Sequence, residues 1–313
     1  RKESSAASDV YKRQFLPLGL LGGSLLFGPI VDRFGHKALL LLSCLIVLFG
    51  LEGIAFFTSI PLLQVSIIGI GLGGGILNGE TNALVADISD EAEKGSRLSL
   101  LGAFYGIGAL GIPVLLSFLA EYYSFEIILQ GTGMIMLIGI LFCLGIRFPA
   151  PKQPQGFPIK EGLGLLKESS LLLLSFILFF QSGIEGVCNN WTTLYLGQTT
   201  GIPENRALIA LTCMVAGLTV ARLLLVVLFK KIKQETVLRT SLITAVAGFA
   251  LLTFAPGFAR AAIGMALIGA GLASTFPVIL SIIGSRYASL SGTALSVALV
   301  IALIGQTLLN SLT

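Results

Sequence analysis

The chain has 313 residues, of which 55% are hydrophobic and 12% are charged, and its mean hydropathy is +0.93. One core in a water-soluble domain of this length could not bury so much apolar surface, so the composition excludes a soluble globular protein. The formal net charge of +4 is small and requires no nucleic-acid partner.

Residues 1–14 are polar, show no helical periodicity and contain no initiating Met. They resemble translated adaptor sequence, so we expect a non-native or disordered stretch that lies outside the fold. The alternative is a short native tail on the cytoplasmic side.

Ten apolar stretches fill the rest of the chain, each near the length of about 20 residues that crosses a bilayer. In lipid the backbone must satisfy its own hydrogen bonds, so each stretch predicts a helix. We therefore expect an all-α integral membrane protein with helices over 15–31, 38–59, 62–88, 98–119, 127–146, 170–196, 206–229, 237–256, 261–284 and 292–313.

The basic loop residues fall almost entirely on one side when successive loops are placed on alternating sides of the membrane. The other side holds only Arg206 and Arg260. An excess of Lys and Arg marks the cytoplasmic side. We expect a multi-pass protein of the cell membrane, inner or plasma, with cytoplasmic Arg33, Lys37, Lys94, Arg97, Arg147, Lys152, Lys160, Lys167, Lys230, Lys231, Lys233, Arg239 and Arg286.

The longest polar break, residues 147–168, contains four prolines and four basic residues. It predicts a cytoplasmic linker between an N-terminal helical bundle, 15–146, and a C-terminal bundle, 169–313. Five predicted spans precede the linker and five follow it. Two repeated bundles joined in this way are typical of secondary transporters, so we expect a fragment that lacks the first and last of twelve helices.

Residues 28–37 follow the pattern G-x-x-x-D-R-x-G-H-K. This pattern resembles the loop between the second and third helices of the major facilitator superfamily, where Arg or Lys usually stands at the position of His36. The alternative is a plain basic loop that obeys only the orientation rule. The resemblance implies a gating motif, which includes Lys37.

Each member of the motif has a physical role in this interpretation. Gly28 lets a neighbouring helix approach closely, and Gly35 permits a tight turn. Asp32 is expected to hold Arg33, or a helix end on the partner bundle, in one of two transport states.

Four further stretches resemble the fourth, fifth, seventh and tenth helices of the fucose–galactose–glucose:proton symporters, within residues 73–85, 97–108, 183–196 and 275–281. The resemblance runs from residue 15 to 313 and implies the major facilitator fold, with helices two to eleven present. Gly102 stands where family members often carry His or Gln, and Tyr105 where some carry Asn. Those side chains help to bind sugar in the family, so these departures leave the solute open.

Glu80 lies inside an apolar run, where a carboxylate costs about 2.5–3.5 kcal/mol at mid-bilayer. We expect Glu80 to exchange the coupling proton, and the alternative is a protonated Glu that ties helices together. Asn78 and Asn82 share one helical face, roughly opposite Glu80. Either the two Asn residues bind solute while Glu80 pairs sideways, or the reverse holds, and the resemblance favours Glu80 facing inward.

Gln181, Glu185, Asn189 and Thr193 recur every four residues and form a polar stripe on one predicted helix. We expect the stripe to line a water-filled path, bind solute and place Glu185 as a second proton-coupling acid. The alternative is interhelical hydrogen bonding, worth about 0.6 kcal/mol per contact.

Two aromatic residues complete the predicted solute contacts. Tyr105 is expected to contact the solute, and Trp191 is expected either to stack on a sugar or to anchor the helix at the outer interface.

Other polar residues have simpler interpretations. Arg222 is expected to extend toward the basic helix end near Lys230, with a solute or gating role as the alternative. His36 is predicted to lie in a cytoplasmic loop, which excludes a His-based site in the membrane. The four cysteines lie in apolar spans without metal-type spacing, so no metal site is expected.

Two glycine runs, 69–74 and 106–111, match the dinucleotide pattern G-x-G-x-x-G. Neither run follows a strand, so a nucleotide-binding loop is excluded. Together with Gly75 and Gly79, these glycines predict close helix packing instead.

The sequence therefore favours a proton-coupled symporter of a small polar solute, a monosaccharide, which works by alternating access and is not an enzyme. One alternative is a drug or metabolite:proton antiporter, although Gly111-Ile-Pro113 breaks the Gly-Pro pair usual in exporters. The other is a non-transporting membrane receptor or scaffold. The expected partners are the solute, the proton and the lipid bilayer, with no cofactor and no nucleic acid, and the protein is expected to be a monomer.

Overall fold

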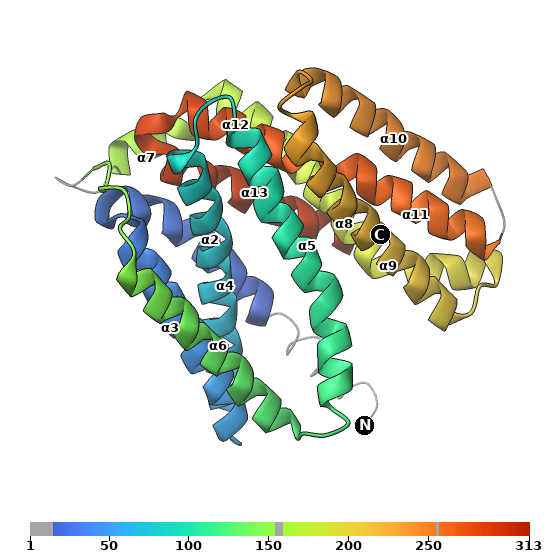
Figure 1. The fold of residues 1–313 in the computed structure, drawn as a ribbon, viewed down its shortest axis with the longest axis horizontal. Helices are drawn as coiled ribbons and strands as arrows, with labels where there is room; N and C mark the ends of the chain where they lie inside the picture. The colour runs from blue at the N-terminus through green and yellow to red at the C-terminus, as the bar shows by residue number, and fades with distance from the viewer. Residues whose placement is uncertain (1–14, 154–158, 255–256) are drawn as a thin grey trace. The chain divides into compact units, whose positions relative to one another are not determined.

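The computed structural model describes residues 15–153, 159–254 and 257–313, so the predicted non-native stretch 1–14 lies outside the described residues. Ten helical segments within this part of the chain are long and apolar enough to cross a membrane, which confirms the predicted all-α membrane fold (Figure 1). The first eight are α2 (Phe15–Phe34), α3 (His36–Phe56), α4 (Ile60–Ile88), α5 (Lys94–Leu119), α6 (Phe125–Gly145), α8 (Ser169–Thr200), α9 (Glu204–Leu228) and α10 (Gln234–Phe254).

The last two spans are interrupted, and a short helix lies in the linker. The ninth span consists of α11 (Phe258–Leu272) and α12 (Thr275–Arg286). The tenth consists of the 3-10 helix η1 (Ala288–Leu290) and α13 (Ser291–Ser311). The linker contains α7 (Ile159–Leu165).

The break between α11 and α12 was not predicted, because 261–284 reads as one apolar run. Helix α11 ends at Leu272, and the backbone N–H of the next residue, Ala273, donates to the carbonyl of Ala270 at 3.4 Å. Pro277 has no N–H to return to the carbonyl of Ala273, and its ring disfavours a continuous helix at that point. The carbonyl of Leu272, at the end of α11, accepts a hydrogen bond from the side-chain amide of Gln181 at 2.9 Å.

The contacts divide the chain into two units. The first contains the described residues up to Leu84, together with Leu115–Glu168 and Tyr287–Val300. The second contains Val85–Val114, Ser169–Arg286 and Ile301–Thr313. Helices α4, α5 and α13 each pass from one unit to the other, so the units differ from two halves divided at the linker. The division at 147–168 stays a prediction.

In the first unit, α3 packs beside α6 through an apolar cluster that includes Cys44, Leu48 and Ile140 (Figure 1). Helix α4 approaches α2 through glycines. A Cβ atom at Gly71 or Gly75 would overlap a backbone carbonyl oxygen of α2. The close packing predicted for this glycine run is therefore present.

In the second unit, α8, α9 and α11 share a core of fully buried side chains that includes Leu196, Met214 and Met265. Helices α9 and α11 also meet at glycines. A Cβ atom at Gly269 would overlap the carbonyl oxygen of Met214, so the two backbones are in contact.

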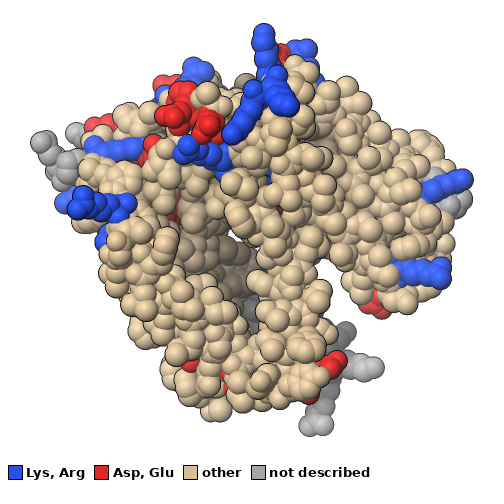
Figure 2. Space-filling view, viewed as in Figure 1, with Lys and Arg blue, Asp and Glu red and all other residues tan. Residues whose placement is uncertain are grey.

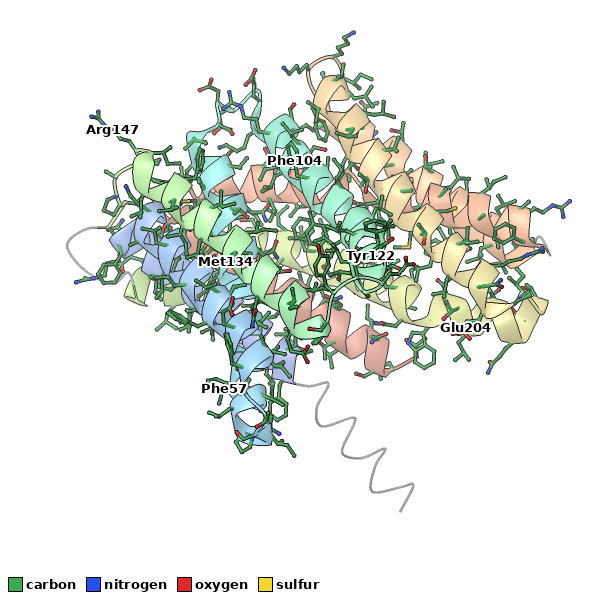
Figure 3. All side chains as sticks on the ribbon, turned by 60° about the horizontal axis from the view of Figure 1, so that its bottom comes forward. Phe57, Phe104, Tyr122, Met134, Arg147 and Glu204 are labelled. Carbon is green, nitrogen blue, oxygen red and sulfur yellow. The ribbon has the colours of Figure 1, made fainter. Side chains whose placement is uncertain are left out.

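The outer sides of the helices are largely apolar, and most of the charged residues lie near helix ends. Phe104 and Met134 are exposed on the sides of α5 and α6, whereas Arg147 and Glu204 lie at the ends of helices (Figure 3). In the view of Figure 2 the Lys, Arg, Asp and Glu side chains likewise gather near helix ends. This distribution suits helices whose sides contact lipid.

Candidate functional site

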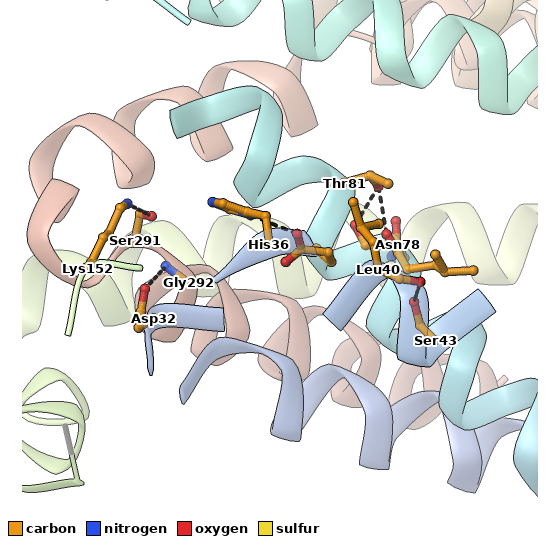
Figure 4. A network of polar contacts seen from close by, with 11 residues as sticks. Asp32, His36, Leu40, Ser43, Asn78, Thr81, Lys152, Ser291 and Gly292 are labelled. Carbon is orange, nitrogen blue, oxygen red and sulfur yellow. Dashed lines mark hydrogen bonds and ion pairs between the residues drawn. The ribbon is translucent and has the colours of Figure 1, made fainter. Parts of the chain in front are cut away.

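Asp32, in the last turn of α2, binds the beginning of α13. Its carboxylate is 2% exposed and accepts the backbone N–H groups of Gly292 at 3.2 Å and Thr293 at 2.8 Å (Figure 4). It also accepts the Thr293 hydroxyl at 2.6 Å. The free N–H groups at a helix N-terminus favour a negative charge by about 0.3–2 kcal/mol. Of the two partners expected for Asp32, the structure shows the helix end, and Arg33 lies over the ring of its neighbour Phe34.

The backbones of α2 and α13 are in close contact beside this carboxylate. A Cβ atom at Gly28 would lie 2.5 Å from the carbonyl oxygen of Gly292 and 2.6 Å from Cβ of Ser296. The Ser296 hydroxyl donates to the carbonyl of Ser24 at 2.6 Å, one turn before Gly28. Gly28 therefore has the role predicted for it, because only a residue without a side chain permits this approach.

The beginning of the linker lies against the same place. The Lys152 ammonium donates to the hydroxyl of Ser291, the first residue of α13 (Figure 4). The Gln153 backbone N–H donates to the carbonyl of Asp32 at 2.7 Å. One short segment therefore contacts both helices that Asp32 joins.

Gly35 and Lys37 shape the turn between α2 and α3. Gly35 has a φ of 80°, a conformation that residues with a side chain rarely adopt. The Lys37 ammonium donates to the carbonyls of Leu144 at 2.9 Å and Ile146 at 3.2 Å. A cation at these last carbonyls of α6 stabilises the helix end.

The prediction for His36 was wrong, because His36 is the first residue of α3 and is 4% exposed rather than part of a solvated loop. Its Nδ1 lies 2.7 Å from Oε1 of Glu80, which is in α4 and has no exposed surface. The imidazole therefore offsets part of the cost of burying this carboxyl group. The pair links the start of α3 to α4 (Figure 4).

Asn78 and Asn82 lie on the other face of α4, as the helical geometry predicts. Asn78 is exposed, whereas Asn82 is buried and donates its amide to the carbonyl of Asn78 at 2.7 Å. Glu80 pairs with His36 of α3, and the question of which face of α4 points to the solute path stays open. Solute binding by the two Asn residues stays a prediction.

The polar stripe of α8 divides into buried and accessible parts. Gln181 is buried and donates to Leu272 at the end of α11, so its amide satisfies a carbonyl freed by the helix break. Glu185 and Thr193 are partly exposed, and Asn189 is exposed with its amide on the carbonyl of Glu185 at 2.9 Å. The roles of these residues with a solute stay predictions.

Trp191 is held by a polar partner within the second unit. Its indole Nε1 donates to the side-chain oxygen of Asn310 in α13 at 3.0 Å. The hydrogen bond fixes the ring against the end of α13. Neither a sugar contact nor an interfacial anchor is required to explain this orientation.

Arg222 does not extend toward Lys230, which corrects the expectation from the sequence. The residue is 8% exposed, and Nη1 donates to the carbonyl of Gly102 in α5 at 3.1 Å. Glu185 of α8 and Tyr105 of α5 are the groups that interact with it electrostatically. The second unit thus brings Arg222 together with two residues of the predicted site.

Another polar contact in the second unit lies where α5 begins. Lys94 donates to Glu91 at 2.8 Å and to the hydroxyl of Ser285 in α12 at 2.8 Å, and Ser285 donates to Glu91. The hydrogen bond from Lys94, followed by that from Ser285, lowers the pKa of the Glu91 carboxyl below its usual value. The contact joins the loop before α5 to the end of α12.

Sequence reasoning missed Thr293 and did not predict the partners of His36 and Arg222. The helix start at Ser291 was visible as a polar break before an apolar run, but its partner was not. No group of three or more metal-binding side chains occurs in the part of the chain that the structure describes.

A family model described as Major Facilitator Superfamily matches residues 15–309. The chain is 26% identical over 214 residues to the "Uncharacterized MFS-type transporter YfkL" of Bacillus subtilis (strain 168), over 65% of this chain and 53% of that protein. It is 30% identical over 163 residues to the "Multidrug resistance protein MdtH" of Aeromonas hydrophila, over 51% of this chain and 39% of that protein. The matches thus span about half or less of these relatives' length.

The fold is similar to that of a solved transporter. The structure of the E. coli fucose:proton symporter FucP superposes with a TM-score of 0.82 and covers 96% of this chain and 83% of that chain. The two sequences are 18% identical. The likeness therefore concerns the arrangement of the helices.

Proposed function

Because the chain belongs to the Major Facilitator Superfamily, we propose that the protein is a secondary active transporter that moves a small polar solute together with a proton. The solute is a monosaccharide. The protein lies in the cell membrane, and the basic linker 147–168 joins two bundles on the cytoplasmic side. The fold likeness to a fucose:proton symporter supports this proposal.

The observation that carries the proposal is the burial of Glu80. An ionisable group inside a membrane helix is costly and marks a path for protons or ions. Glu80 has no exposed surface and contacts the only histidine of the chain. Glu80 takes up and releases the coupled proton, and Glu185 is the second acid of this kind.

Alternating access requires an element with two states. In this proposal the contact of Asp32 with the start of α13 is that element, and it forms in one transport state and opens in the other. The geometry of this contact suits the role. Asp32 accepts hydrogen bonds from neighbouring backbone N–H groups at the start of one helix, so these bonds can break together. Arg33, Gly35 and Lys37 shape the turn that presents Asp32.

The solute contacts are the polar groups within the spans. Tyr105, Asn189 and Thr193 have accessible surface in the second unit. Asn78 is accessible in the first. Gln181, Trp191 and Asn82 complete the proposed set of solute-binding residues, and Asn82 also donates to the carbonyl of Asn78.

The test records external pH when monosaccharides are added to de-energised, weakly buffered cells that express the protein. Alkalinisation is expected with the unchanged protein and not with Glu80→Gln, which cannot carry the proton. Exchange of labelled sugar should persist in Glu80→Gln. Glu52→Gln is the matched control, since Glu52 is a partly buried acid of the same unit, and it should leave alkalinisation unchanged. Sugar exchange without any pH change in the unchanged protein would refute proton coupling.

A second candidate function is proton-driven export of a drug or metabolite. The likeness to a multidrug resistance protein favours it. Exporting cells would accumulate less of a fluorescent drug than control cells when energised. Drug exclusion without sugar exchange would replace the first proposal with this one.

A further inference from the structure

Arg222 is a buried cation, and no carboxylate of the residues that the structure describes is in contact with it. It lies six residues before the end of α9, about 9 Å along the helix. A charge within a span is costly, so it normally has a partner or a function. Among the described residues no ion pair joins Arg222 to an acid. Its position therefore needs an explanation beyond helix packing.

Most hydrogen-bond donors of the guanidinium group have no partner among the described residues. Of its five N–H groups, the described contacts use only Nη1, on the carbonyl of Gly102. Nε is buried and has no hydrogen-bond partner in the described chain. Nε and Nη2 form one edge of the guanidinium, the edge that matches the two oxygens of a carboxylate.

Helix α5 provides the space for this group. A Cβ atom at Gly102 would lie 2.8 Å from Nη1 and 3.0 Å from Cζ of Arg222. The Ser99 hydroxyl donates to the backbone carbonyl of Arg222 at 2.8 Å, which holds α5 against α9 at this level. The absence of a side chain at 102 thus leaves room for the guanidinium group beside α5.

The neighbouring groups leave the positive charge only partly balanced. Glu185 and Tyr105 interact with Arg222 electrostatically, and Cys188 lies one turn beyond Glu185 on α8. Neither Glu185 nor Tyr105 donates to or accepts from the guanidinium in the described contacts. A ligand with one negative charge and two coplanar oxygens would satisfy both the charge and the free donors.

We propose that Arg222 binds the carboxylate of the solute, which makes the solute a monosaccharide acid rather than a neutral sugar. This proposal rests on the proposed transport of a monosaccharide and specifies its class. Tyr105, exposed on the same helix as Gly102, is placed to contact the rest of the molecule. A phosphate ester offers the same kind of oxygens, so the experiment must separate the two anions.

Binding is measured by isothermal titration calorimetry on the purified protein, without a proton gradient. The ligands are galactose, galacturonate and galactose 1-phosphate. Galacturonate should bind at least 10-fold more tightly than galactose and more tightly than the phosphate ester. Equal binding of galactose and galacturonate, no binding of galacturonate, or tighter binding of the phosphate ester would overturn the proposal.

Variants separate ligand binding from a packing role. Arg222→Gln should weaken galacturonate binding at least 10-fold and change galactose binding less than 2-fold, and Arg222→Lys should recover part of the loss. Gly102→Ala keeps the charge but displaces the guanidinium, so it should also weaken galacturonate selectively. Arg239→Gln, at an exposed arginine of α10, is the control. Equal weakening of both sugars in Arg222→Gln and Gly102→Ala would show a structural role and refute the assignment.

The calorimetric measurement of ligand binding does not depend on proton coupling. Selective binding of galacturonate without proton movement in cells would keep the solute class and reject the symport mechanism. Proton-coupled galactose uptake without acid selectivity would keep the proposed function and reject the role of Arg222.

Discussion

The contact between His36 and Glu80 shows how one side chain changes the environment of another inside a membrane helix. A buried carboxyl group loses its hydration, and one strong hydrogen bond returns part of that free energy. The Nδ1 to Oε1 distance is 2.7 Å and both residues are buried. The stability of the α3–α4 contact should therefore depend on both residues jointly.

A double-mutant cycle tests this dependence. His36→Ala and Glu80→Gln should each lower the free energy of unfolding, and their effects should be non-additive by about 1–3 kcal/mol, because each variant removes the same contact. The measurement is thermal or denaturant unfolding of the purified protein in detergent.

The control cycle pairs His36→Ala with Glu52→Gln. These positions are sixteen residues apart on α3, about 24 Å along the helix, so their effects should add within about 0.5 kcal/mol. Additive effects for His36 and Glu80 as well would show that the contact contributes nothing to stability.

The sequence could not reveal these partners, because they are far apart in the chain. His36 and Glu80 are separated by 44 residues, and Asp32 and Gly292 by 260. The residue types were informative: Asp32 and Gly28 were predicted to join a neighbouring helix, and they do. Arg222 was misjudged because a basic helix end eight residues away offered a simpler explanation.

The helices could be predicted from the sequence because few backbone structures satisfy their own hydrogen bonds in lipid. Length and apolar composition together required a helix wherever about 20 such residues occurred. The break between α11 and α12 escaped this reasoning, since hydropathy does not report which carbonyls find partners. Pro277 was the available signal, and Gln181 from α8 supplies the hydrogen bond that the break requires.

Close packing of α9 on α11 leads to a prediction at this scale. Gly269→Ala should destabilise the protein by about 1–3 kcal/mol, because the new methyl group would overlap backbone atoms of Met214. The matched control is Gly139→Ala in α6, where a Cβ atom meets nothing within 4 Å. That change should be neutral or stabilising by up to about 1 kcal/mol through helix propensity. The measurement is the melting temperature of each purified variant. Equal melting temperatures for the two variants would contradict the close contact between α9 and α11.

For the whole molecule, the fold class followed from the spans and the motif of residues 28–37. The grouping of helices into contact units did not follow, because it depends on which side chains meet after folding. Segments 85–114 and 287–300 pack with helices from the other side of the linker. Hydropathy predicts that a helix spans the membrane but contains no information on its neighbours.

Orientation in the membrane is the property of the whole chain that the charges predict most directly. Lys167 and Glu204 are exposed at positions before and after α8, which has 32 residues and therefore extends about 48 Å. The two positions should lie on opposite sides of the bilayer, with Lys167 inside because the basic loops stay in the cytoplasm. In a background with Cys44, Cys143, Cys188 and Cys213 replaced by Ala, a membrane-impermeant maleimide applied to intact cells should label Glu204→Cys and not Lys167→Cys. Permeabilised cells should show both labelled. Labelling of Lys167→Cys in intact cells would reverse the orientation and place the contact of Asp32 with α13 on the outer face.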